Sequence, residues 1–176
     1  MTEPAQKVCI HNTTPVCERV DLLQDFAVRG SASPVIASLA GVVSNRVRPV
    51  ALQTSRRVGE WYQWLIAEEA LREAHKLPYV ADPPDKDCYR DVELTARQGG
   101  ECKALNVFYV ALLLRLGVPA EVVWIDQPGR PLNHVASLVW LDGQPLWADA
   151  SIAGARLGES PYEALDRTGA WHVVGG

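Results

Sequence analysis

The chain has 176 residues, of which 48% are hydrophobic and 22% are charged, and its formal net charge is −4. These fractions are close to the averages of globular proteins, and they exclude wholesale disorder and collagen-like or coiled-coil structures. A chain of this length buries enough surface for one core, so we expect a single domain over residues 1–176. The basic residues are scattered, so we expect neither nucleic acid nor a membrane as a partner.

The N-terminal residues carry the weakest structural signal. Residues 1–31 mix apolar pairs with Asn, Thr, Pro and Gly, and they predict at most a short strand or one helical turn. The chain starts with neither a basic segment followed by an apolar one nor a run of about 18 apolar residues. We therefore expect no signal peptide and no membrane span, and a cytoplasmic location.

The four cysteines, Cys9, Cys17, Cys88 and Cys102, are irregularly spaced and contain no CxxC pair. A chain of this size does not need disulfides for stability, so we expect four free thiols. The spacing of cysteines and histidines is not typical of a metal site, and we expect no metal and no cofactor. One alternative stays open, a structural zinc site that uses Cys88, Cys102 and His134.

Residues 1–80 are expected to be mainly helical. Residues 33–47 begin with a serine N-cap and a proline at the first helical position, and apolar residues follow at helical spacing. Residues 55–76 separate into an apolar and a charged face with a period of about 3.6, and Leu-Pro ends this helix. The next segment, residues 79–91, is rich in Pro and Asp and predicts a surface loop.

The C-terminal part, residues 81–176, is expected to contain one buried helix followed by strands. Residues 102–116 are apolar on almost every side and end at a Gly-Val-Pro stop, which predicts a helix buried all round. Segments rich in Val, Trp and Leu predict antiparallel strands at 120–125, 134–141 and 144–150. Asp142-Gly143 indicates a two-residue hairpin between the last two. A helical turn is expected at residues 161–166.

Cys102 stands just after Gly99-Gly100, where the buried helix begins. Cysteines most often pack as small hydrophobic side chains. The first turn of a helix, however, offers free N–H groups and a positive dipole end, which stabilise a thiolate. The two glycines would let a substrate backbone approach closely. Cys102 is therefore a candidate nucleophile.

His134 and Asp149 are the candidate partners of this thiol. A nucleophilic cysteine needs a base, and histidine can serve as one near neutral pH. With a two-residue turn at Asp142-Gly143, counting back along the hairpin places Ala136 opposite Asp149. His134 and Asp149 then become diagonal neighbours on one face of the sheet, whereas a three-residue loop without a compensating bulge would separate them. Asp149 lies between apolar residues and needs a partner, and an imidazole that it orients is a suitable one.

These segments resemble the transglutaminase-like superfamily, which has a papain-like cysteine-peptidase fold. The resemblance covers about residues 82–152, where Gly-x-Cys opens a helix ending at Leu-Gly-Val-Pro-Ala, a histidine begins a strand and an aspartate follows a Trp-containing strand. It implies an α+β fold in which the helix carrying the cysteine packs on an antiparallel sheet carrying the histidine and the aspartate. It also implies that Cys102 is the nucleophile, His134 the base and Asp149 the residue that orients it.

The segment before Cys102 is more similar to small stand-alone bacterial and phage members than to the large animal crosslinking enzymes. The chain departs from the family pattern at two places. Lys103-Ala104 stands where many relatives carry an acidic pair, and Ala136 stands where many carry an aromatic residue. Neither departure removes one of the three candidate residues.

The expected function is thiol-dependent acyl transfer on peptide or carboxamide bonds, as a cysteine protease, an amidase or a transglutaminase with a peptide or protein substrate. Hydrolysis and amine transfer share one thioester intermediate, so both stay open. The backbone N–H of Cys102 would hold the oxyanion, and Gln98 is a candidate second donor. The alternative is a binding or assembly module that keeps the fold without chemistry.

Overall fold

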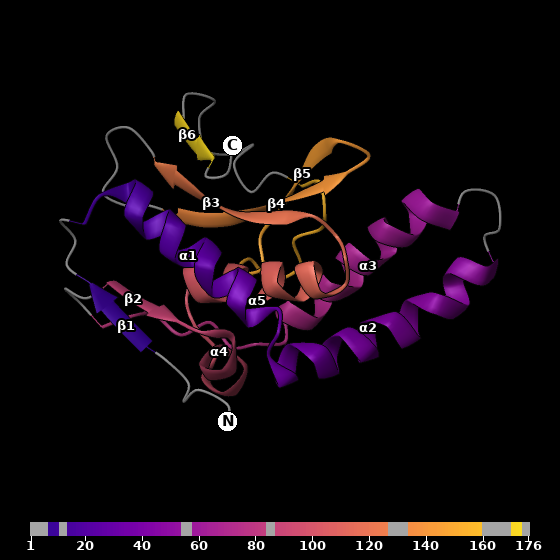
Figure 1. The fold of residues 1–176 in the computed structure, drawn as a ribbon, viewed down its shortest axis with the longest axis horizontal. Helices are drawn as coiled ribbons and strands as arrows, with labels where there is room; N and C mark the ends of the chain where they lie inside the picture. Colours follow the sequence, from indigo (N-terminus) through magenta and orange to yellow (C-terminus); the bar gives the residue numbers. More distant parts are fainter. Residues whose placement is uncertain are drawn as a thin grey trace.

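The computed structural model describes residues 7–10, 14–53, 58–83, 87–126, 134–159 and 170–173, which form a mixed α+β fold (Figure 1). The helices are α1 (Val16–Gly30), α2 (Pro34–Gln53), α3 (Val58–Ala74), α4 (Val92–Gln98) and α5 (Cys102–Arg115). The strands are β1 (Lys7–Ile10), β2 (Asp87–Arg90), β3 (Ala120–Asp126), β4 (His134–Leu141), β5 (Gln144–Ala148) and β6 (Ala170–Val173).

Helix α5 is the centre of the core. Every residue from Cys102 to Leu113 is buried, as the uniformly apolar sequence predicted. Helices α1, α2, α3 and α4 pack against it, and strands β3 and β4 cover another side (Figure 1). The helix ends where Gly117 adopts a positive φ of 75° and Val118 N–H donates a bond of 3.0 Å to the Leu113 carbonyl. The helices and strands packed around α5 position its first residue, Cys102.

The larger sheet has the strand order β5-β4-β3-β6, with antiparallel neighbours throughout. Asp142 and Gly143 form the expected two-residue turn, and both have positive φ values, 52° and 74°. The turn pairs Leu141 with Gln144, and the same register continues to the pair Ser137 and Ala148. Strand β6 was not expected from the sequence.

The two expected N-terminal helices are present with shifted ends, as α2 and α3, and a third helix, α1, precedes them. Helix α1 was missed because Pro15 at its N-cap gives no side-chain capping bond, and its stability comes from burying Val20, Leu23 and Phe26. Among the described residues, no single helix has the length and hydropathy needed to span a membrane. Helix α1 and residues 34–51 reach this length and hydropathy only as a pair, and a 70° bend separates them.

The segment 79–91 is not only a surface loop, as the sequence suggested, because it contains the buried strand β2. Strand β1 pairs with β2, and a disulfide joins Cys9 to Cys88. The expectation of four free thiols is therefore wrong for these two, whereas Cys17 and Cys102 are free. The zinc alternative also fails, because the Cys88 sulfur is bonded to Cys9. The helical turn expected at 161–166 lies outside the described residues.

Candidate active site

The turn before Cys102 is shaped by two buried glycines. Gly99 has a φ of 71°, and a Cβ there would lie 2.0 Å from the carbonyl oxygen of Pro78. A Cβ on Gly100 would lie 2.4 Å from the Cβ of Ala104. Gly100 also exchanges backbone hydrogen bonds with Pro78 and Val80. The missing side chains thus make room for the protein's own chain, and not for a substrate backbone as the sequence suggested.

A buried ion network fixes the residues on either side of Cys102. Three carboxylates and three basic side chains form it: Asp82, Asp87, Glu101, Arg19, Arg90 and Lys103. The Lys103 ammonium contacts Asp87 and Glu101 and lies 3.7 Å from Asp82. These carboxylates are close enough together to ligate a metal ion, but the ammonium group lies among them. Opposite charges are equal in number, so the network is electrically balanced.

His134 and Asp149 lie side by side, although the last pair of the β4–β5 ladder is Ser137 with Ala148, one pair before the expected pair of Ala136 with Asp149. Nε2 of His134 is 2.6 Å from Oδ2 of Asp149, whose side chain is fully buried. Burial alone lowers the pKa of His134, but hydrogen bonds with Asp149 and Cys102 and their negative charges raise it to about 10. Burial alone raises the pKa of Asp149, but bonds from His134 and Ser151 hold it below its usual value. The imidazole is therefore protonated at neutral pH.

The three residues selected from the sequence thus come together in one cluster. Cys102 occupies the first residue of α5 and is 9% exposed. Its side chain interacts with His134 and raises the pKa of the imidazole, and Asp149 is bonded to Nε2 of the same ring. Thiol, imidazole and carboxylate therefore lie in one row.

Ser151 and His75 hold Asp149 in place. The backbone N–H and hydroxyl of Ser151 donate to Oδ1 of Asp149, at 2.8 and 2.6 Å. The ring nitrogen Nε2 of His75, just after α3, lies 3.1 Å from the Asp149 carbonyl oxygen. One carboxylate oxygen is therefore bonded to Ser151, while the other faces His134.

Asn106 is the residue of this site that sequence reasoning missed. Its side chain is fully buried. Its amide nitrogen lies within hydrogen-bond distance of the Cys102 carbonyl, the Val135 carbonyl and Oδ1 of Asp149, and its oxygen accepts from Ser137 Oγ and Ala150 N–H. One side chain thus joins the start of α5, strand β4 and the segment that carries Asp149. The available signal was a polar residue one helical turn after Cys102 in an apolar helix.

Tyr79 lies at the rim of the cluster. Its backbone forms an isolated parallel bridge with Gly100, and its side chain is 59% exposed. Burial of its hydroxyl and the negative charges of Cys102, Asp82 and Asp149 raise its pKa. Gln98, the second oxyanion donor suggested by the sequence, is the exposed last residue of α4.

Comparison with known proteins gave limited likenesses. A scan against protein-family models and a search of curated proteins each found no match. Two solved structures are similar: one described as a "putative cysteine protease" from Cytophaga hutchinsonii, with 14% identity and a TM-score of 0.40, and one described as a TGase, with 17% identity and a TM-score of 0.39. The first match covers 73% of this chain and 46% of the cysteine-protease chain. The second covers 88% of this chain and 38% of the TGase chain. These values are too low to assign a family or an activity.

Proposed function

We propose that the protein is a thiol-dependent acyl-transfer enzyme of the transglutaminase-like type, acting on peptide or carboxamide bonds. Cys102 is the nucleophile, His134 the acid and base, and Asp149 the residue that orients the imidazole. The observation that carries this proposal is the row of three neighbouring groups, the Cys102 thiol, the His134 imidazole and the Asp149 carboxylate. It begins at the N-terminus of a buried helix, where a thiolate is favoured.

The first half of the reaction forms a thioester. Protonated His134 stabilises the Cys102 thiolate, which attacks the carbonyl carbon of the substrate. The oxyanion lies against the free N–H groups in the first turn of α5, where Glu101 gives no side-chain capping bond. As the C–N bond breaks, His134 gives its proton to the departing amine, and the acyl group stays on the Cys102 sulfur.

The second half releases the acyl group. Neutral His134 removes a proton from water or from a second amine, which then attacks the thioester carbon. The C–S bond breaks and the thiolate returns, paired again with the protonated imidazole. Water gives a carboxylic acid, as in a peptidase or amidase, and an amine gives a new amide, as in a transglutaminase.

The test compares the two free thiols of the oxidised protein, because Cys17 is exposed and Cys102 is buried. At pH 6, iodoacetamide should alkylate Cys102 at least about tenfold faster than Cys17, as mapped by peptide mass spectrometry, although Cys102 is less accessible. Unreactive thiols have little thiolate at this pH. Asp149→Asn should remove most of the difference. Faster alkylation of Cys17 would contradict the proposal and favour a binding or assembly module.

A second measurement follows the acyl group itself. Incubation with a casein digest should add acyl mass to the wild-type protein at Cys102, and hydroxylamine should remove it, as expected for a thioester. Cys102→Ala is the control and should gain no mass. The absence of any hydroxylamine-sensitive adduct, together with slow alkylation, would reject the enzyme.

A further inference from the structure

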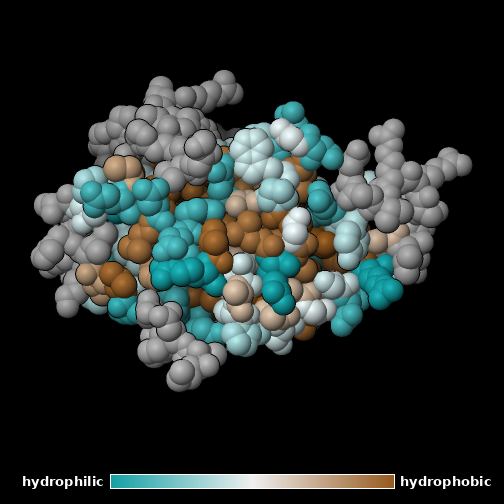
Figure 2. Space-filling model, viewed as in Figure 1, coloured by the Kyte–Doolittle hydropathy of each residue, from teal (hydrophilic) through white to brown (hydrophobic). Residues whose placement is uncertain are grey.

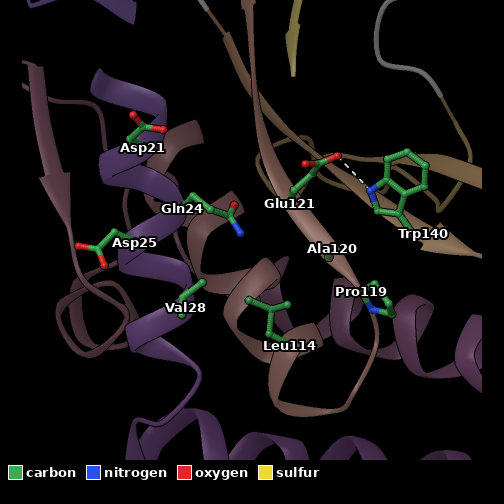
Figure 3. Close-up of a pocket in the computed structure, with 9 residues that line it drawn as sticks. All are labelled: Asp21, Gln24, Asp25, Val28, Leu114, Pro119, Ala120, Glu121 and Trp140. Atoms are coloured by element: carbon green, nitrogen blue, oxygen red, sulfur yellow. Dashed lines mark hydrogen bonds between the residues drawn. The ribbon is translucent and has the colours of Figure 1, made fainter. Parts of the chain in front are cut away.

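A cavity of about 460 Å³ opens between α1, the end of α5 and strands β3 and β4 (Figure 3). Val28, Leu114, Pro119 and Trp140 supply apolar walls. Figure 2 shows this face, where apolar side chains gather at the centre between hydrophilic ones. Leu114 lies twelve residues after Cys102 on α5, which corresponds to about 18 Å along the helix. The cavity is therefore separate from the candidate active site.

The carboxylate of Glu121 is buried in the wall of this cavity. The residue is only 9% exposed, and burial raises the pKa of the carboxyl group. Trp140 Nε1–H donates a hydrogen bond of 3.0 Å to Oε1. Figure 3 shows the second oxygen turned away from Trp140, toward α1. Among the residues that the structure describes, no basic side chain lies within 4.0 Å of Glu121.

The other buried carboxylates in the described parts of the chain all have a basic partner within this distance. The pairs are Glu68 with Arg72, Glu73 with Arg46 and Lys76, Asp87 with Arg19 and Lys103, and Asp149 with His134. A buried carboxylate without a positive partner is unfavourable, and pairing relieves this. Unlike these other buried carboxylates, Glu121 has no basic partner among the described residues, and it borders an open cavity.

The rest of the lining favours a positive ligand. Asp21 and Asp25 also border the cavity, and none of the described residues that line it is basic. Asp25 is paired with Arg29, whereas no ion pair of Asp21 is found among the described residues. Trp140, which is 37% exposed, presents its N–H edge to Glu121, and this leaves the second carboxylate oxygen for the ligand.

We propose that this cavity binds an organic cation, an alkylammonium or guanidinium group, that pairs with the Glu121 oxygen turned toward α1. The alkyl part of the ligand packs on the apolar walls. A lysine or arginine side chain of a partner protein and a free amine share this chemistry. The proposal does not depend on the acyl-transfer activity.

The indole N–H of Trp140 is the natural reporter, because it donates to Glu121. n-Butylammonium, n-butylguanidinium and neutral n-butanol are titrated into the ¹⁵N-labelled full chain, and Trp140→Phe assigns the resonance. The two cations should shift this resonance saturably, and n-butanol should not. Glu121→Gln keeps an oxygen acceptor for the indole and should weaken cation binding at least about tenfold. Glu18→Gln, an equal change of charge at an exposed position of α1, should leave affinity unchanged.

Two further arms complete the experiment. Blocked Gly-Lys-Gly and Gly-Arg-Gly peptides that bind more tightly than the butyl compounds would indicate a protein side chain, and weaker or equal binding would indicate a free amine. Cys102→Ala should bind normally, which separates this proposal from the acyl-transfer one. Three outcomes would overturn the cation-binding proposal: no saturable shift of the Trp140 resonance, an equal shift with n-butanol, or an unchanged affinity in Glu121→Gln. If Glu121→Gln does not fold, the comparison of cations with n-butanol decides.

Discussion

The imidazole of His134 is held on one side by a buried carboxylate and faces a thiol on the other. Both neighbours favour its protonated form, and together they overcome the effect of burial. Cys102, His134 and Asp149 could be selected from the sequence, because helix-start and hairpin patterns place them. The sequence marks Asn106 only as a polar residue in an apolar helix, and it does not reveal the bonds of Asn106 and Ser151, because these join segments whose packing no local pattern describes.

His134 should keep its proton far above the ordinary range of histidine. Because its pKa rises from 6.5 to about 10 in the folded protein, the pair with Asp149 stabilises the fold fully below pH 6.5, and this contribution is lost as pH rises toward 10. A titration of the ring by NMR should show a midpoint near 10. Asp149→Asn and Cys102→Ala should each lower it, and a wild-type midpoint near 6.5 would contradict the assignment.

Asn106→Ala should disorder the site more than it weakens the core. The change leaves Ser137 and the Ala150 N–H without their acceptor, and should lower the free energy of unfolding by about 1–3 kcal/mol. Alkylation of Cys102 at pH 6 should slow at least about tenfold. Val107→Ala, another buried change on α5, is the control and should destabilise comparably while leaving alkylation fast. Equal rates of Cys102 alkylation in the two variants would show that Asn106 contributes only to packing and does not position the site.

At the scale of elements, the connection from α4 to α5 and the β4–β5 hairpin position the site. The hairpin was predictable because Asp-Gly turns have a strong local preference for positive φ at both positions. Helix α4 was not, since the bond that the Leu94 N–H donates to its N-cap residue Asp91 begins in a segment dominated by Pro and Asp. Local patterns identify a turn more readily than a seven-residue helix.

Gly99→Ala should be strongly destabilising, because a Cβ would meet the Pro78 carbonyl and alanine disfavours a φ of 71°. We expect a loss of at least about 2 kcal/mol in chemical denaturation, with slower alkylation of Cys102. Gly41→Ala is the matched control, since a Cβ there meets nothing within 4 Å in helix α2. It should be neutral or stabilise by up to about 1 kcal/mol. Similar losses in both variants would refute the packing role of Gly99.

At the scale of the whole molecule, the N-terminal strand reaches the active-site end of the core through the β1–β2 pair. The Cys9–Cys88 disulfide closes 79 residues of chain. The neighbouring residue Asp87 belongs to the ion network around Lys103. The sequence could not reveal this pairing, because cysteine spacing alone does not identify partners so far apart.

Breaking this disulfide should lower global stability more than it changes the site. The loop-entropy relation gives a loss of about 4.5 kcal/mol for a loop of this size. Cys88→Ser should show this loss in chemical denaturation, and Cys17→Ser, which removes an exposed free thiol, should show none. A thiol assay on the denatured, non-reduced wild type should count two thiols. Four thiols would contradict the disulfide.

The sequence by itself determined the buried helix that begins at Cys102, the Asp142-Gly143 turn and its register, and the choice of Cys102, His134 and Asp149. Each follows from apolar patterning or turn preferences within a few residues. Only the tertiary structure decided the disulfide, the ion network, the Asn106 bonds and the cavity beside Glu121. These depend on which distant segments pack together, and long-range packing in the folded chain, rather than local preference, sets those distances.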